Sequence, residues 1–181
     1  MLPDLPPDDR LLIRTPRLDL VPLVAADAID LFPVLDDAAL GRWTGEAPPP
    51  DIETLRARLV VWETRRAPDG AELWLNWTMR RREDGSALGH LQATVTADAA
   101  AIAWVVGTAF HRQGFATEAG GALVGWLRGS LGVTVIEASI HPGNVASQTV
   151  ASRAGLRATG RVLDGEVVWV LERHIVPSSQ G

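Results

Sequence analysis

The feature that most restricts the fold of this chain is an apolar stretch that runs through a glycine turn into a helical pattern, at residues 103–119 (AWVVGTAFHRQGFATEA). A second such unit, at residues 141–156 (HPGNVASQTVASRAGL), follows a β-branched stretch and starts its helical pattern at Asn144, a residue type that often caps helices. The first N–H groups of a helix have no partner within the helix and carry partial positive charge, so they attract anions. The two units together predict a scaffold that presents backbone N–H groups to a pyrophosphate.

The order of the predicted elements indicates an α/β fold in a single domain. Residues 11–23 are predicted to form either a pair of strands or one strand with a bend at Pro16. Further strands are predicted at residues 73–81, 87–96, 102–106, 133–140, 157–163 and 166–173, and helices at 25–35, 52–66, 114–129 and 144–154. The strands at 73–81, 87–96 and 102–106 follow one another as a meander, and the order from the last of them onward is β-α-β-α-β-β. We therefore expect a mixed, mostly antiparallel twisted sheet that is flanked by helices and contains one parallel crossover. Residues 1–10, rich in proline and aspartate, are predicted to be a flexible tail, and residues 11–176 to form the domain.

The composition excludes several classes of protein. The chain has no cysteine, which excludes disulfides, zinc–thiolate sites and thiol nucleophiles, and no metal cofactor is expected. All 17 basic residues are arginine, which excludes a phosphate-binding loop of the Walker type, because that loop needs a lysine. A net charge of −5 disfavours nucleic acid as a partner. No apolar stretch approaches the roughly 20 residues of a membrane span, and the first residues do not resemble a signal peptide, so we expect a cytoplasmic protein with no membrane partner.

The glycine turn at residues 113–117 (QGFAT) is the candidate anion site. Gly114 allows the backbone to approach a ligand closely, Ala116 keeps the surroundings small, and Arg112 adds a full positive charge. The alternative is that Gly114 only shapes a tight passage from strand to helix. The turn is not a dinucleotide-binding fingerprint, because the GxGxxG spacing is absent.

Residues 111–116 resemble the acetyl-coenzyme A signature of the Gcn5-related N-acetyltransferase superfamily, [Gln/Arg]-x-x-Gly-x-[Gly/Ala]. Four further segments are similar to the branch that acetylates the N-termini of ribosomal proteins: residues 14–18 (RTPRL), 117–119 (TEA), 144–147 (NVAS) and 154–156 (AGL). The similarity covers about residues 11–172. It implies an N-acetyltransferase, with acetyl-coenzyme A as cosubstrate, that moves the acetyl group to a primary amine of a protein N-terminus or a small molecule by direct attack on the thioester.

The resemblance also implies which residues bind the cofactor. The strand before the loop splays from its neighbour and pairs with the pantetheine arm through its backbone, and the loop N–H groups bind the pyrophosphate. The residues implied are Trp104, Val105, Val106, His111, Arg112, Gln113, Gly114, Phe115, Ala116, Thr117, Asn144 and Ser147. Two positions depart from the family pattern: His111 stands where the signature has glutamine or arginine, and Leu156 replaces the usual aromatic residue. For Asn144, a role as helix N-cap is an alternative explanation.

Two readings are open for each candidate catalytic residue. Many members of the superfamily place a tyrosine, as general acid for the departing thiolate, where this chain has Ala151; the resemblance therefore favours Ser147, which otherwise serves only the first turn of its helix. The attacking amine must be neutral, so a base is needed, and His90, with an ordinary pKa near 6.5, is the first candidate. The alternative is a packed strand histidine. Glu72 is a second candidate base, whereas Gln92, on the same strand face as His90, is able only to orient water.

Four of the seven tryptophans, Trp43, Trp62, Trp74 and Trp77, lie in the N-terminal half, where this superfamily forms its acceptor pocket. Trp62 and Trp77 continue apolar stripes, so we expect them in the core. We expect Trp43 foremost, and Trp74 beside it, to contact the amine, because an aromatic face attracts a cation.

A function of another class stays open at this point. The lack of tyrosine and of an obvious carboxylate base is also consistent with a non-catalytic acyl-coenzyme A-binding or sensory module on the same fold. Thioester turnover with an amine would distinguish the two. The identity of the acceptor and the formation of a homodimer are not decided by the sequence.

Overall fold

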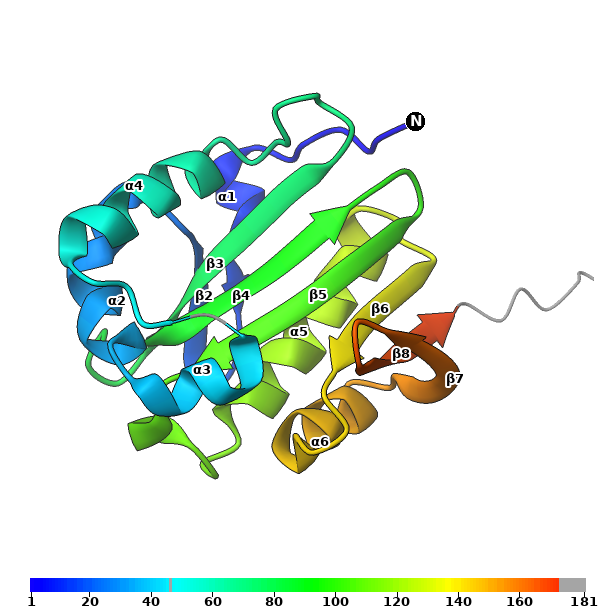
Figure 1. Ribbon diagram of the computed structural model, residues 1–181. Coiled ribbons are helices and arrows are strands. Elements are labelled where there is room, and N and C mark those ends of the chain that lie inside the picture. The colour runs from blue at the N-terminus through cyan, green and yellow to red at the C-terminus, as the bar shows by residue number, and fades with distance from the viewer. Residues whose placement is uncertain (46, 173–181) are drawn as a thin grey trace, which may run out of the picture.

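A computed structural model describes residues 1–45 and 47–172, and in this part of the chain eight strands form one sheet in the order β1-β2-β3-β4-β5-β6-β8-β7 (Figure 1). The strands are β1 (Ile13–Arg14), β2 (Leu18–Pro22), β3 (Leu73–Arg81), β4 (Ala87–Val95), β5 (Ala99–Val106), β6 (Val135–Ile140), β7 (Arg157–Leu163) and β8 (Glu166–Glu172). All neighbouring strands are antiparallel except β5 and β6, which are parallel. The predicted mixed, mostly antiparallel sheet with one parallel crossover is confirmed.

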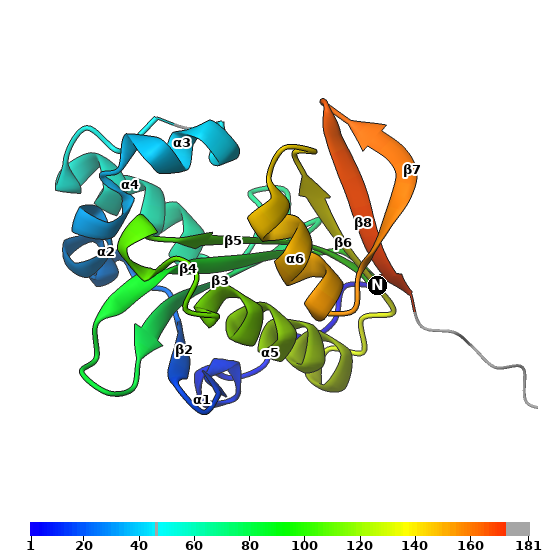
Figure 2. The same cartoon turned by 90° about the horizontal axis from the view of Figure 1, so that it is seen from below.

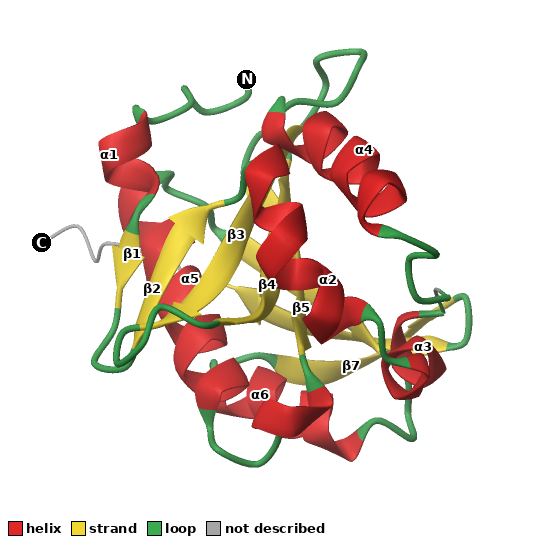
Figure 3. Cartoon of the chain, turned by 90° about the vertical axis from the view of Figure 1, so that its left-hand side faces the viewer, coloured by secondary structure: helices red, strands yellow, loops and turns green. Residues whose placement is uncertain are grey.

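Helices cover both faces of this sheet (Figures 2 and 3). The helices are α1 (Asp8–Leu11), α2 (Ala28–Leu35), α3 (Ala38–Thr44), α4 (Ile52–Glu63), α5 (Phe115–Ser130) and α6 (Val145–Arg153), with short 3-10 turns η1 (Ala25–Asp27) and η2 (Thr108–Phe110). Because side chains alternate along a strand, Leu75, Trp77 and Met79 of β3 are buried in the core that α5 covers, while α2 and α4 cover the opposite face. No helix in the described part of the chain is long and apolar enough to cross a membrane.

The boundaries of several elements differ from those predicted. Helix α3 was not predicted, although Asp37 caps its start through the Ala39 N–H and Gly45, at φ 70°, ends it. The helix predicted at 52–66 ends at Glu63, since Arg65 adopts a left-handed φ of 60° that a helix cannot contain. Residues 173–176, the end of the predicted last strand and domain, lie outside the described residues.

The N-terminal ten residues make contacts with the domain. Leu2 and Leu5 pack, partly buried, against the main core, and the Arg10 carbonyl accepts a hydrogen bond from Trp126 Nε1 at 3.0 Å. The flexibility expected of residues 1–10 stays a prediction, as does the extent of the domain.

Strands β5 and β6 separate halfway along their length. They pair only where Ala99–Ala101 faces Val135–Glu137, whereas β5 stays paired with β4 up to Val106 and β6 stays paired with β8 up to Ile140. Hydrogen bonds from Gly107 N to Leu88 O and from Thr96 N to Ala99 O show that odd-numbered residues of β5 bond to β4. The N–H and C=O groups of Trp104 therefore face the gap between β5 and β6.

Candidate functional site

Two cavities meet at the gap between β5 and β6. The larger, of about 420 Å³, lies over the N-terminal ends of α5 and α6, and the smaller, of about 300 Å³, lies between α3, α4 and the sheet. The residues common to both linings are Leu40, Trp43, Thr44, Trp104, Val105, Asn144 and Ser147. We call the larger one the loop cavity and the smaller one the inner cavity. A ligand in one cavity can therefore meet a ligand in the other across the gap.

The loop that precedes α5 has an unusual backbone. Arg112 adopts φ 59° and Gly114 adopts φ 83°, both in the left-handed region. The Glu118 N–H donates to Gly114 O at 3.0 Å, which closes the first helical turn and leaves the N–H groups before it without a helical acceptor. Such a run of N–H groups, at the positive end of a 16-residue helix, is an arrangement that attracts anions.

The His111 side chain makes a hydrogen bond to the end of β5, the strand that precedes it in the chain. Its Nε2 lies 2.8 Å from the Val106 carbonyl oxygen, so this nitrogen carries the hydrogen and donates it. The bond occupies the Val106 carbonyl at the gap and fixes the imidazole at the loop cavity. The departure from glutamine or arginine at this position thus gives the loop a link to β5.

Eleven of the twelve residues predicted to bind the cofactor line the loop cavity. These are Trp104, Val105, Val106, His111, Arg112, Gly114, Phe115, Ala116, Thr117, Asn144 and Ser147. Gln113 does not line it: its side-chain amide donates to Ala109 O at 3.2 Å. Predicted residues from two separate segments are therefore brought together around one cavity, while their contacts with a cofactor stay a prediction.

Ser147 lies at the junction of the two cavities. Its backbone N–H donates to Asn144 Oδ1 at 3.1 Å, so Asn144 is the N-cap of α6. This bond uses only the backbone of Ser147 and does not engage its hydroxyl, and the residue lines both cavities. Ala151, one turn further, is fully buried and lines neither cavity. A hydroxyl at the junction must therefore come from Ser147 or from Thr44 of α3.

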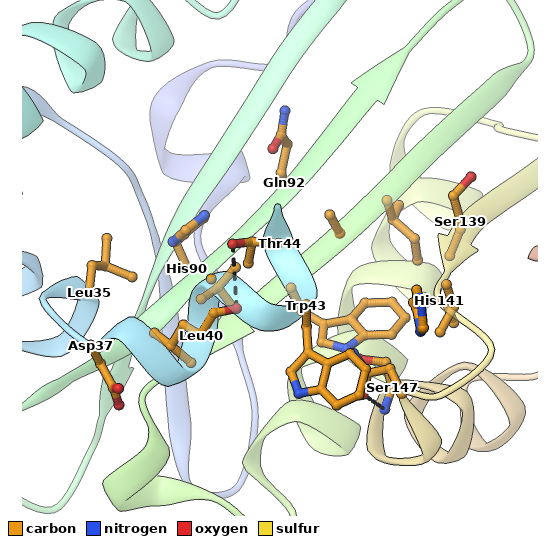
Figure 4. Close-up of a pocket in the computed structure, with 18 of the residues that line it drawn as sticks. Leu35, Asp37, Leu40, Trp43, Thr44, His90, Gln92, Ser139, His141 and Ser147 are labelled. Carbon is orange, nitrogen blue, oxygen red and sulfur yellow. Dashed lines mark hydrogen bonds between the residues drawn. The ribbon is translucent and has the colours of Figure 1, made fainter. Parts of the chain in front are cut away.

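His90 lies on the floor of the inner cavity, beside Gln92 (Figure 4). Burial lowers its pKa to about 4, with a further contribution from the charge of Arg58. This corrects the expected value near 6.5: His90 is neutral at physiological pH, but it is a weak base. Its ring is 5.5 Å from that of Trp62, and its buried Nδ1 has no hydrogen-bond partner among the described residues.

Of the two residues predicted to contact the acceptor, the structure places Trp43 at the cavities and Trp74 away from them. Trp43 extends from α3 toward Ser147 and lines both cavities (Figure 4). Trp74 lines neither cavity, and its Nε1 donates instead to Glu72 Oε2 at 2.9 Å, so the second candidate base also lies outside. Trp62, which was expected in the core, packs partly buried against the core under α2 and α4 and also lines the inner cavity beside His90. Trp77 is buried, as expected, with 1% of its surface exposed.

Several residues of the inner cavity escaped the sequence analysis. They include Leu40 and Thr44 of α3, Arg58 of α4, Ser139 and His141 at the end of β6, and Glu166 of β8. The α3 residues could have been found from the cap at Asp37 and the glycine at position 45. Glu166 carries no local signal, because only the pairing of β8 with β6 brings it to the cavity.

The inner cavity has charged groups at its edges. The Asp37 pKa is lowered by the Thr108 hydroxyl and then by the Ala39 N–H, both of which donate to its carboxylate. Glu166 is half-buried and pairs with Leu163 through the β7–β8 ladder, while its carboxylate makes no hydrogen bond or ion pair with any residue that the structure describes. Among residues 1–45 and 47–172, no group of three histidine, aspartate or glutamate side chains is placed to hold a metal ion.

Comparison with known proteins gives one family and a shared fold. A family model described as an acetyltransferase (GNAT) domain matches residues 17–157. No curated protein sequence matches the chain. Many solved structures do match it.

Three of these structures illustrate the likeness. RimJ from Mycobacterium smegmatis, in complex with CoA-disulfide, has a TM-score of 0.75 and 21% identity over 92% of this chain and 88% of its own. An acetyltransferase of the GNAT family from Bacillus anthracis has a TM-score of 0.74 and 17% identity over 89% and 98%. The aminoglycoside acetyltransferase AAC(6')-Ib, in complex with coenzyme A, has a TM-score of 0.70 and 18% identity over 86% and 95%. At such identities the comparison establishes the common fold.

Proposed function

This chain belongs to the acetyltransferase (GNAT) domain family, and from that premise we propose that it transfers the acetyl group of acetyl-coenzyme A to a primary amine, of a protein N-terminus or a small molecule. The observation that carries the proposal is the gap between β5 and β6, at which a loop cavity suited to a pyrophosphate meets an inner cavity of aromatic and polar side chains. The structures of RimJ and AAC(6')-Ib contain CoA-disulfide and coenzyme A respectively, which supports the same ligand class here.

The residues of the loop cavity fit acetyl-coenzyme A in two ways. The N–H groups at the start of α5 attract the pyrophosphate, and Arg112 adds a positive charge beside them. The peptide groups of Trp104, turned toward the gap, offer a donor and an acceptor to the amides of the pantetheine arm. The thioester then lies near Ser147, at the junction with the inner cavity.

In the reaction we propose, the amine nitrogen bonds to the thioester carbonyl carbon, and the bond from that carbon to sulfur breaks. The amine loses a proton and the thiolate takes one up. Ser147, at the junction, donates to the departing sulfur, and its hydroxyl proton is replaced from solvent. His90, neutral because its pKa is about 4, accepts a hydrogen bond from the incoming amine or from an intervening water and passes the proton on without retaining it.

Glu166 is the side chain of the inner cavity that favours a cationic acceptor. Its half-buried carboxylate attracts a protonated amine, whereas the guanidinium groups of Arg42 and Arg58 already lie over the rings of Trp43 and Trp62, at 4.7 and 5.3 Å. We expect Glu166→Gln to raise the KM for the amine several-fold and to leave the affinity for coenzyme A unchanged. An equal KM in the variant would remove Glu166 from the acceptor site.

Calorimetric titration with acetyl-coenzyme A and with desulfo-coenzyme A is the first test. Micromolar binding of both ligands is expected, followed by turnover with a panel of peptide and small-molecule amines. No binding of either ligand would contradict the proposal.

The same experiment tests a non-catalytic acyl-coenzyme A-binding module, which the alanine at position 151 and the low pKa of His90 favour. Such a module would bind both ligands without turnover. For an enzyme, Ser147→Ala should lower kcat by about 10²-fold with the affinity for coenzyme A unchanged, whereas Ser152→Ala, an exposed serine on the same helix, should have no effect.

A further inference from the structure

The turn between β1 and β2 contacts the first turn of α5, about 100 residues later in the chain. Glu118 of α5 accepts three hydrogen bonds from this turn: from Thr15 Oγ1 at 2.6 Å, from Arg17 N at 2.9 Å and from Arg17 Nε at 2.7 Å. The carboxylate is largely buried, with 16% of its side chain exposed, while Arg17 is 48% exposed. The contact is thus a multiple, charge-assisted link between two distant segments.

Arg17 extends this link to the anion loop itself. Its Nη1 donates to Gln113 O at 3.0 Å, and its guanidinium carbon lies 4.5 Å from the centre of the Phe115 ring. A Cβ on Gly114 would lie 3.4 Å from Arg17 Nη2. One guanidinium therefore joins Glu118, on the first turn of α5, to the backbone just before that helix.

The turn is held from its other side by the end of β3. The Arg82 N–H donates to Arg17 O at 2.9 Å, and Arg82 Nη1 donates to Thr15 O at 3.1 Å. The backbone carbonyl groups of Thr15 and Arg17 are consequently tied to the sheet, on the side of the turn away from the loop.

The charges of this cluster bear on an anion at the loop. Burial alone would raise the pKa of Glu118, but the hydrogen bonds from Thr15 and Arg17 outweigh it and lower the pKa, so the group is a carboxylate at neutral pH. An unpaired carboxylate in the first turn of α5 would repel a pyrophosphate bound there. Arg17 neutralises that charge and holds the loop, whose residue 112 has an unfavourable φ, in this conformation.

We propose that Thr15, Arg17 and Glu118 form a clamp that positions the anion loop for the pyrophosphate of coenzyme A, with Arg17 as the positioning residue. The inference rests on the proposed function, and it adds residues that line neither cavity. It gives a joint role to residues 14–18 and 117–119. Both segments resemble a family pattern, and the sequence alone does not show that they contact each other.

Calorimetry with coenzyme A tests the clamp in Arg17→Met, Glu118→Gln and the double variant. Each single change is expected to weaken binding about 10-fold or more, and the double variant should bind no more weakly than the weaker single variant, because both changes break one link. Arg17→Lys should also lose affinity, since a single ammonium cannot bond to Glu118 and Gln113 O in the same fork geometry. Arg161→Met, which breaks the surface pair with Glu137 on the far edge of the sheet, is the control and should bind as the wild type does.

Two ligand fragments separate the clamp from other roles of Arg17. Dephospho-coenzyme A retains the pyrophosphate and should show the same fold-loss, whereas turnover of S-acetylpantetheine, which has no pyrophosphate, should change less than twofold. Four outcomes would each overturn the clamp. The variants would bind coenzyme A as tightly as the wild type, or their loss of affinity would disappear with dephospho-coenzyme A. Alternatively, their turnover of S-acetylpantetheine would fall as much as their affinity for coenzyme A, or Arg17→Lys would bind as the wild type does. The wild-type titration tests the proposed function separately: binding there with unaltered variants refutes the clamp alone, and no binding refutes both.

Discussion

At the residue scale, Gly114 combines a positive φ of 83° with a position at the opening of the loop cavity. Replacement by glutamate adds a negative charge at the proposed pyrophosphate site and forces a side chain into a backbone conformation that glycine tolerates best, at a cost of about 1 kcal/mol. We expect Gly114→Glu to reduce the affinity for coenzyme A more than 100-fold in calorimetry, while the protein stays folded by circular dichroism.

The matched control for this change is Gly132→Glu. Gly132 also has a positive φ, 69°, and open space around its Cα, but it follows the C-terminal end of α5. It should suffer a similar loss of stability and no loss of affinity. If both variants bind coenzyme A equally well, the anion site is not at the loop.

His90 makes the stability of the protein dependent on pH. Its pKa is about 4 in the folded chain and 6.5 when unperturbed, so between these values the unfolded chain binds a proton that the folded chain does not. The free energy of unfolding therefore falls as the pH is lowered from 6.5 to 4, by about 3 kcal/mol at 1.36 kcal/mol per pKa unit. Urea denaturation at pH 7.0, 5.5 and 4.5 measures this slope.

The variant His90→Gln should abolish most of that slope, because the amide does not titrate. Gln92→Ala is the control: this residue lies on the same strand, carries no titratable group and should leave the slope intact. A wild-type stability that is constant from pH 6.5 to 4.5 would show that His90 titrates alike in the folded and unfolded chain.

At the scale of elements, α3 connects the two sides of the gap. Asp37 at its start bonds to the Thr108 hydroxyl of η2, and Trp43 at its end lies 5.6 Å from the ring of His141, beyond β6. This short helix therefore covers the junction of the cavities, held by one contact at each end and by the buried side chain of Leu40 between them.

Asp37→Ala removes both the cap of α3 and its bond to η2. We expect the amides of α3 to exchange hydrogen several-fold faster and the KM for the amine to rise several-fold, because a loosened α3 no longer holds Trp43 at the junction. Asp36→Ala, a neighbouring exposed carboxylate, should change neither quantity. Unaltered exchange in Asp37→Ala would mean that packing of Leu40 alone fixes this helix.

At the scale of the whole molecule, the parts of the fold with local signals could be predicted. Residues close in sequence encode these parts, and the structure confirms them: the hairpin turn at Asp164 and Gly165, the caps at Asp51 and Asn144, and the strand 73–81. Contacts between distant segments could not be predicted. Three such contacts depend on how the sheet is assembled: His90 lies buried beside Trp62, Glu166 lines the inner cavity, and Arg17 bonds to Glu118.

The gap between β5 and β6 divides the sheet, and a ligand in it would bridge the two parts. Acetyl-coenzyme A bound there would contact β5, α5 and α6 together, and would stabilise the folded state by an amount that rises with the logarithm of its concentration above the dissociation constant. At 100 times the dissociation constant, linkage gives about 2.7 kcal/mol, which corresponds to a rise in Tm of roughly 5–10 °C for a chain of this length. Differential scanning fluorimetry at increasing acetyl-coenzyme A measures the shift. Pantetheine alone should give a smaller shift, since it leaves the loop at Gly114 without an anion, and equal shifts for the two ligands would place the binding energy in the strand gap alone.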